Sequence, residues 1–237
     1  MIDNNTSIRA CMRCGSDNDL TTYNLLDEPI TLCKSCYTRI RGDLNPGKFV
    51  GISKIEEGVR YILEGLHDEF GLNLQDENFR DTPKRVARAY YEMCCGINCQ
   101  EEIDNILSTS FPAKYGGMVV AKGIQCFSLC PHHLLPVEYS VNVGYIPKDR
   151  TIGLSKIPRI VELLAKAPKL QEDFTWDIVE ALKRIDCKGV IVQVDGKHMC
   201  MGSRGAKQPN VHTLTSSIYG VFERPEVREE FQLIIHQ

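Results

Sequence analysis

Cysteine and histidine residues gather in two parts of the sequence, and in each part their spacing is typical of a metal site. In the first part, Cys11 and Cys14 form one CxxC pair, and Cys33 and Cys36 form a second. Four thiolates complete the tetrahedral shell of a zinc ion and leave no place for water, so such a site is structural. We therefore expect one structural zinc ion in residues 1–48, a segment too short to fold on an apolar core alone.

The second group contains both cysteine and histidine residues, spread over about 70 residues of the sequence. Catalytic zinc has three protein ligands and a fourth position open to water. Some members of the group should therefore bind the metal, and the others should transfer protons. Taken alone, the Cys-Pro-His-His motif could also be a strand end with one buried histidine. The candidates are Cys130, His132, His133, His198 and Cys200.

The N-terminal segment is expected to support the fold or to contact a protein partner. Residues 1–48 hold as many Lys and Arg as Asp and Glu residues, and zinc with four thiolates subtracts two further charges. The module is thus mildly acidic, which suits a phosphate backbone poorly, so a nucleic acid is not expected as a partner. Turn residues over 44–48 predict the linker that follows.

Composition places the rest of the chain among ordinary folded proteins. Of 237 residues, 43% are hydrophobic and 25% are charged, and the formal net charge is -3. This length predicts one main domain with a smaller appendage, or two domains of modest size. The sequence shows neither a signal-peptide core nor an apolar run long enough to span a bilayer, so we expect a soluble cytoplasmic protein. In a reducing compartment, its 11 cysteines favour thiolates on zinc over disulfides.

Hydrophobic periodicity predicts an α+β protein in which helices back an antiparallel sheet. Ser53 begins a capping box, Thr82 precedes a proline at a helix start, and Ser155 is expected to cap a third helix. The first two strands are joined by the Cys-Pro-His-His loop. The predicted helices are 53–70, 82–95, 155–164, 171–185 and 225–231, and the predicted strands are 118–126, 137–147, 189–194 and 213–222.

From about residue 55 to the C-terminus, several motifs together resemble the GTP cyclohydrolase I family. The resemblance implies the tunnelling fold, in which sheets of neighbouring subunits associate into rings. It also implies a homo-oligomer, commonly a decamer of two pentamers, with sites between subunits. It does not extend to residues 1–48, so we divide the chain into a zinc-ribbon or treble-clef-like module (1–48) and a catalytic domain (49–237). The motifs are Asp81-Thr82-Pro83-Lys84-Arg85-Val86-Ala87, Cys130-Pro131-His132-His133, Gly144-Tyr145-Ile146-Pro147, Gly153-Leu154-Ser155-Lys156-Ile157-Pro158-Arg159, Gln171-Glu172, His198-Met199-Cys200-Met201 and Arg204-Gly205.

The resemblance also implies a reaction and the residues that perform it. The family opens the guanine ring of GTP at C8, releases formate and recloses the product as 7,8-dihydroneopterin triphosphate. Cys130, His133 and Cys200 would bind a catalytic zinc ion, which lowers the pKa of a bound water. His198 near the purine and His132 near the sugar would transfer protons.

Recognition of GTP would need a carboxylate and several cations. By the resemblance, Glu172 accepts hydrogen bonds from N1–H and the 2-amino group of guanine, beside Gln171. Cations and helix N–H groups would bind the triphosphate. These residues are Ser155, Lys156, Arg159, Arg204 and, lent by a neighbouring subunit, Arg85, with Arg88 where the family often has lysine.

Some positions depart from the family pattern. Pro131 stands where the family commonly has glutamate, and residues 167 and 173 lack the usual arginines. One alternative is therefore a catalytically weak or idle homologue that binds a nucleotide or a protein. Another is a nitrile reductase of the deazapurine pathway, but the zinc-site residues are not its signature.

Overall fold

The computed structural model describes residues 20–25, 28–33 and 50–237 of the chain. The chain divides into two compact units, Met1–Cys95 and Gly96–Gln237. Cys11, Cys14, Cys36 and the predicted linker at 44–48 lie outside the described residues. Within the described residues, no helix has both the length and the apolar character that a bilayer span requires.

The first unit contains a strand hairpin and a pair of packed helices. Strands β1 (Leu20–Leu25) and β2 (Glu28–Cys33) are antiparallel, with Leu20 opposite Cys33. Helix α2 (Val50–Phe70) packs against α3 (Thr82–Cys94), and the short helix η1 (Glu77–Phe79) precedes α3.

Two helix starts in this unit differ from the sequence prediction. Ser53 lies inside α2, not at its N-cap, because the apolar stripe extends back to the buried Ile52, one heptad before Val59. The N-cap of α3 is Asp81, not Thr82, whose hydroxyl instead donates to the Asn78 carbonyl oxygen at 3.3 Å.

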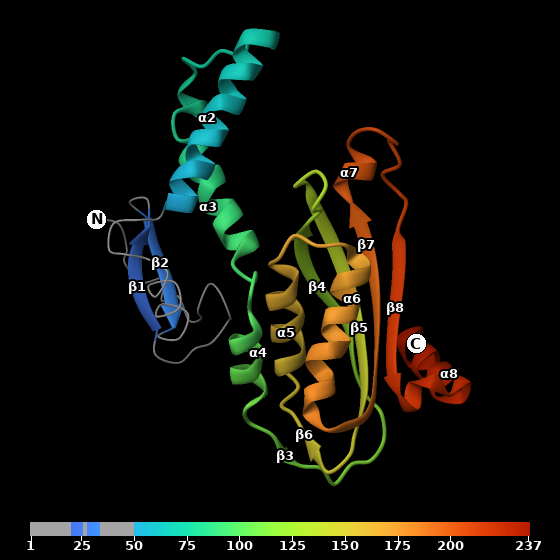
Figure 1. Cartoon of the computed structure of the whole chain (residues 1–237). Helices are drawn as coiled ribbons and strands as arrows, with labels where there is room; N and C mark the ends of the chain where they lie inside the picture. Colours follow the sequence, from blue (N-terminus) through green and yellow to red (C-terminus); the bar gives the residue numbers. More distant parts are fainter. Residues whose placement is uncertain (1–19, 26–27, 34–49) are drawn as a thin grey trace. The chain divides into compact units, whose positions relative to one another are not determined.

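The second unit is built on a four-stranded antiparallel sheet in the order β4-β5-β7-β8 (Figure 1). Its strands are β4 (Val119–Leu129), β5 (Pro136–Pro147), β7 (Cys187–His198) and β8 (Thr213–Gly220). Before it come α4 (Gln100–Leu107), which the hydrophobic periodicity did not predict, and β3 (Phe111–Pro112), which pairs with β6 (Arg150–Thr151). The predicted α+β class with an antiparallel sheet is confirmed.

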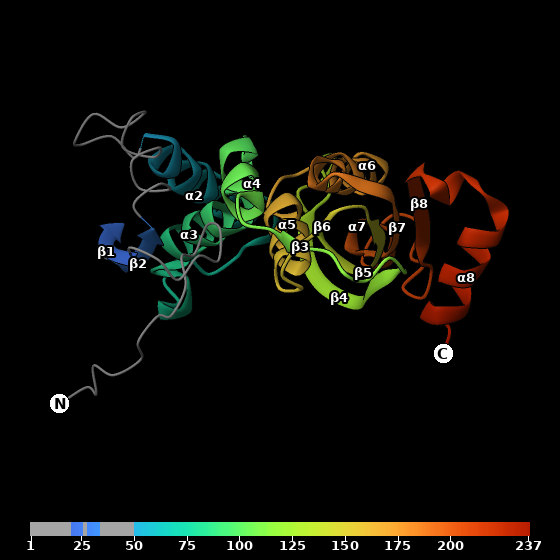
Figure 2. The same cartoon turned by 90° about the horizontal axis from the view of Figure 1, so that it is seen from below.

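Helices α5 (Lys156–Ala165) and α6 (Gln171–Leu182) cover one face of this sheet (Figures 1 and 2). Alternate residues of β5 point into the core, which explains the period of two in the sequence. Helix α6 continues into η2 (Lys183–Ile185). The side chains that fill this core include Val141, Val143, Tyr145, Ile160 and Phe174.

The C-terminal segment packs on the other face of the sheet. The short helix η3 (Val221–Glu223) leads into α8 (Pro225–Ile235), and Phe222 and Phe231 form a second cluster with Ile191 of β7. Figure 2 shows α8 beyond β8, away from α5 and α6. Helix α8 therefore shields one end of the sheet face that the larger core leaves uncovered.

One end of the sheet collects the residues that could do chemistry. Strand β4 ends there, β5 begins there, and Val137 at the start of β5 lies opposite His198 at the end of β7. The four-residue helix α7 (Met199–Gly202) follows directly. Antiparallel pairing thus brings together two motifs that lie about 70 residues apart in the sequence.

Candidate functional site

The turn between β4 and β5 presents the first half of the site. Cys130 follows the last residue of β4, and its carbonyl oxygen accepts from Leu134 N–H at 2.8 Å. Leu134 adopts a positive φ of 52°, which reverses the chain within a few residues. Cys130 is buried, whereas His132 and His133 are exposed, so the turn holds the thiol inside and leaves both imidazoles accessible.

Cys130, His133 and Cys200 form a cluster that fits a metal ion. Their candidate ligand atoms all lie within 4.8 Å of one another. Zinc bonds sulfur at about 2.3 Å and nitrogen at about 2.0 Å, so a tetrahedral site places the two about 3.6 Å apart. The distance from Cys130 Sγ to His133 Nδ1 is 3.7 Å, which matches this value. A soft donor set of two thiols and an imidazole is one that zinc prefers.

Local contacts orient the members of this cluster. Arg204 Nη1 donates to Nε2 of His133 at 2.9 Å, and Nδ1 of the same ring faces Cys130. A metal ion at Nδ1 requires the ring hydrogen on Nε2, where it would face an arginine that can only donate, so Arg204 must turn away from Nε2 when a metal binds. Burial raises the pKa of the Cys200 thiol, and its hydrogen bond with Cys130 raises it further. A bound cation reverses this effect, because a coordinating thiol loses its proton. His132 Nδ1 lies 3.9 Å from Cys130 Sγ, which leaves His132 beside the cluster.

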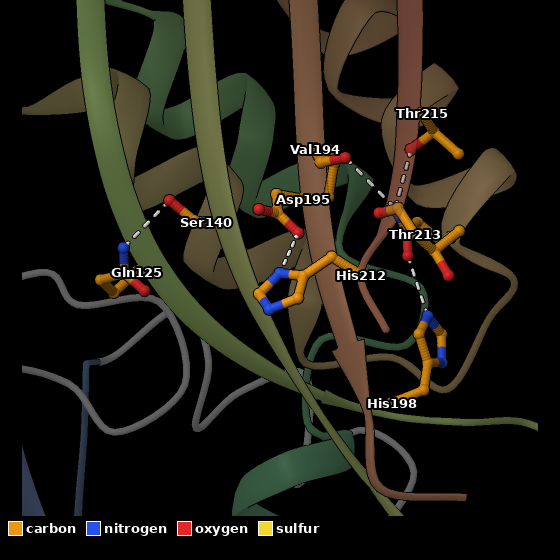
Figure 3. A network of polar contacts seen from close by, with 9 residues as sticks. Gln125, Ser140, Val194, Asp195, His198, His212, Thr213 and Thr215 are labelled. Atoms are coloured by element: carbon orange, nitrogen blue, oxygen red, sulfur yellow. Dashed lines mark hydrogen bonds and ion pairs between the residues drawn. The ribbon is translucent and has the colours of Figure 1, made fainter. Parts of the chain in front are cut away.

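His198 is held at the end of β7 by the first turn of α6. Its Nε2 lies 2.8 Å from Oε1 of Gln171, and its ring meets Tyr139 edge-on with centroids 6.2 Å apart. Figure 3 shows His198 below Thr213 and Thr215, at the end of the sheet. Burial lowers the pKa of His198, and the charge of Glu172 partly opposes this shift. Glu172 is exposed, so its carboxylate is accessible to a ligand.

Two of the predicted cations lie at the start of α5. Ser155 occupies the N-cap as expected, but its side chain makes no capping hydrogen bond. Lys156 Nζ donates to the Thr109 carbonyl oxygen at 2.5 Å, and burial followed by the charge of Arg159 lowers its pKa. Lys156 and Arg159 are three residues apart on α5, so their side chains lie on the same side of the helix.

Arg85 and Arg88 lie on α3, in the first unit. Arg85 pairs with Asp81 at 3.7 Å, and Arg88 pairs with Glu92 at 3.1 Å.

The structure brings the metal-binding and proton-transfer candidates and Gln171 together at one end of the sheet. Ser155, Lys156 and Arg159 lie toward the opposite end, where α5 begins next to β6 and Lys156 contacts Thr109 (Figure 1). The contributions of α5 and of the two arginines of α3 to a GTP site stay predictions. The structural zinc also stays a prediction, because its cysteines lie outside the described residues except Cys33, the last residue of β2.

Comparison with known proteins identifies the family. The family model for GTP cyclohydrolase I matches residues 55–236. The chain belongs to the GTP cyclohydrolase I family. The GTP cyclohydrolase 1 of Finegoldia magna is 42% identical over 171 residues, which cover 72% of this chain and 90% of that protein.

Further relatives extend the match over most of the catalytic region. The GTP cyclohydrolase 1 of Carboxydothermus hydrogenoformans is 40% identical over 78% of this chain and 95% of its own length. That of Streptomyces griseus is 42% identical over 77% of this chain and 89% of its own. Among solved structures, the apo archaeosine synthase QueF-Like covers 45% of this chain at 20% identity and a TM-score of 0.38, too low to establish a shared fold.

The family resemblance stated from sequence motifs is confirmed by this match. Three residues near the site were not singled out from the sequence: Tyr139, Thr175 and Thr215. The alternating pattern of β5 could have indicated Tyr139, because it places this ring on the same face of the sheet as Val137. Val137 is the residue that pairs with His198 on β7. No sequence signal marks the two threonines, whose hydroxyls lie 2.6 Å apart across α6 and β8.

Proposed function

We propose that the chain hydrolyses the imidazole ring of GTP, releases C8 as formate and recloses the product to 7,8-dihydroneopterin triphosphate. The observation that carries this function is the three-ligand cluster of Cys130, His133 and Cys200 beside His198, in a chain of the GTP cyclohydrolase I family. Three protein ligands leave a coordination position open, as catalysis requires. The cluster therefore favours an active enzyme over a homologue that only binds nucleotide or protein.

The catalytic metal in this proposal is zinc, held by Cys130 Sγ, His133 Nδ1 and Cys200 Sγ. When bound, zinc acts as a Lewis acid and lowers the pKa of a coordinated water toward about 7, which supplies a nucleophile at neutral pH. The turn after β4 and the short helix α7 fix the ligand positions before the metal arrives. Nδ1 of His133 already faces Cys130 Sγ, and metal binding at Nδ1 places the ring hydrogen on Nε2.

Two imidazoles transfer the protons of ring opening and reclosure. His198 serves the purine nitrogen and His132 serves the ribose ring oxygen, since both lie next to the metal ligands. Glu172 accepts from N1–H and the 2-amino group of guanine, an edge that adenine does not offer. Gln171 stands beside it at the start of α6.

Arg204 binds the triphosphate beside the metal ligands, together with Ser155, Lys156 and Arg159 of a neighbouring subunit, because in one chain the start of α5 lies at the opposite end of the sheet from Arg204. Arg85 and Arg88 add cations from a neighbouring subunit of a tunnelling-fold decamer of two pentamers. The sheet order supports association through edges, because β4 and β8 have no further partner strand among the described residues.

The N-terminal module adds a second zinc ion in this proposal. Cys11, Cys14, Cys33 and Cys36 bind it as a closed structural site, and the module supports the fold or contacts a protein partner. The spacing of the two CxxC pairs supports this assignment. A cytoplasmic location follows from the requirement for reduced thiolates and for GTP.

Product analysis tests the proposed function. Reduced protein of known zinc content is incubated with GTP, and formate and dihydroneopterin triphosphate are followed by mass spectrometry. Equal amounts of the two products are expected, whereas ATP should give neither, because adenine cannot satisfy Glu172. Binding of GTP by the zinc-loaded protein without formate release would overturn the proposal and favour the binding-only alternative.

A further inference from the structure

Gln171, the first residue of α6, carries a polar side chain that is turned into the protein. Only 3% of the residue is exposed. Its Oε1 lies 2.8 Å from Nε2 of His198, and a Cβ added at Gly196 would meet this oxygen at 2.2 Å, so the glycine leaves the space that the amide occupies. The side chain that the family resemblance places on substrate is thus engaged with a proton-transfer residue.

The surroundings of the amide decide which of its ends faces His198. Its Nε2 donates to the Thr213 carbonyl oxygen at 2.7 Å and to the Val194 carbonyl oxygen at 3.2 Å. It also lies 3.1 Å from Thr215 Oγ1. Backbone carbonyls only accept hydrogen bonds. In the reverse orientation, the amide oxygen would therefore face the carbonyl oxygens of Val194 and Thr213 with no hydrogen between them. The NH₂ group must therefore face β7 and β8, and Oε1 must face His198.

This orientation determines the tautomer of His198. An amide oxygen can only accept, so Nε2 of His198 must carry the hydrogen. A neutral imidazole has one N–H group, which leaves Nδ1 without a proton. We propose that Gln171 is a positioning residue that holds His198 as the Nε2–H tautomer and makes Nδ1 the nitrogen that exchanges protons with the substrate. This inference rests on the proposed function of His198.

Hydrogen bonds from neighbouring elements hold Gln171 in the position that fixes the His198 tautomer. Thr175 Oγ1 donates to the Gln171 carbonyl oxygen at 2.7 Å and lies 2.6 Å from Thr215 Oγ1. The amide is therefore tied to α6, β7 and β8 at once. Fixing one tautomer of a catalytic histidine is worth orders of magnitude in rate in other enzymes, because the wrong tautomer presents a hydrogen where an acceptor is needed.

Nitrogen NMR tests the tautomer without reference to activity. Zinc-loaded protein labelled with ¹⁵N-histidine is measured by solid-state NMR at about pH 8, above the ordinary histidine pKa. The His198 signals are assigned by their loss in His198→Asn. We expect a protonated Nε2 and an unprotonated Nδ1 in the wild type, and a mixture of tautomers in Gln171→Met. A protonated Nδ1 in the wild type would overturn the inference.

Steady-state kinetics separates positioning from substrate contact. Gln171→Met should lower kcat by about 100-fold, the usual scale of a proton-transfer contribution, while KM for GTP changes by less than about threefold. Gln125→Met is the matched control, because it breaks the 3.0 Å bond to Ser140 and should leave both constants within about twofold.

An increase in KM at unchanged kcat would show that Gln171 binds substrate and would refute the positioning role. If the wild type releases no formate from GTP, the proposed function fails. The NMR measurement still decides the tautomer in that case.

Discussion

Replacing Cys200 by serine removes one of the three ligands that we assign to the catalytic zinc. The three ligand atoms lie within 4.8 Å of one another, so the variant retains only a thiolate and an imidazole. Changes outside the ligand shell already cost about 10–100-fold in metal affinity, so loss of a direct ligand should cost more than about 100-fold. The expected result is a decrease of about one zinc ion per chain relative to the wild type.

The assay is elemental analysis after dialysis against a zinc-buffering chelator, with formate release measured on the same samples. Cys126→Ala is the matched control, because it also removes one thiol from this unit. Burial and the charge of Glu162 raise the pKa of Cys126 to about 12, so it stays a protonated core residue and should not affect zinc content. Equal zinc contents in Cys200→Ser and the wild type would refute the assigned ligand set.

Three further substitutions test the packing and the substrate contacts. Phe174→Leu should lower the free energy of unfolding, measured by urea titration, by about 1–2 kcal/mol, because the buried ring stacks on Tyr139 with centroids 4.8 Å apart. The control Phe127→Leu changes an exposed ring and should lower this free energy by less than about 0.5 kcal/mol. Glu172→Gln should reduce kcat/KM for GTP by about 10–150-fold, because guanine loses a charged hydrogen-bond acceptor. The control is the adjacent Asp173→Asn, and a reduction of similar size in this variant would refute guanine recognition by Glu172. Lys156→Met should raise KM for GTP by about tenfold with kcat nearly unchanged, whereas the control Lys148→Met should leave KM unaltered. An unaltered KM in Lys156→Met would show that Lys156 does not bind the triphosphate.

The sheet could be predicted from the sequence because its signal is periodic. Alternation from Val137 to Tyr145 predicted a half-buried strand, and β5 (Pro136–Pro147) has its inward residues at these alternate positions. Helix α4 escaped prediction because its eight residues form barely two turns, too few for an apolar stripe to stand out from the flanking turns.

Helix starts were the least predictable features. Ser53 and Thr82 are both good capping residues, but apolar packing at Ile52 and the proline at position 83 allow the helices to begin earlier. A capping motif in a sequence shows that a residue can cap a helix, whereas tertiary contacts decide whether it does.

The candidate site also contains one part that the sequence predicted and one part that it did not. The grouping of five cysteine and histidine residues predicted a metal site, and the family resemblance implied Cys130, His133 and Cys200 as its ligands. The antiparallel pairing of β5 with β7 brings these three residues together. The hydrogen bonds of Gln171 could not be predicted, because two of its acceptors are backbone carbonyls, which are the same for every residue type. Residue identity fixes donors and ligands, but only the fold determines where carbonyl groups point.

The most direct test of the proposed function uses GTP labelled with ¹³C at C8. Hydrolysis of the imidazole ring must place this carbon in formate, so the zinc-loaded protein should release ¹³C-formate in a one-to-one ratio with unlabelled dihydroneopterin triphosphate, and the Cys200→Ser variant should release almost none. Label retained in the nucleotide after incubation of the fully zinc-loaded protein with GTP would contradict the proposed function.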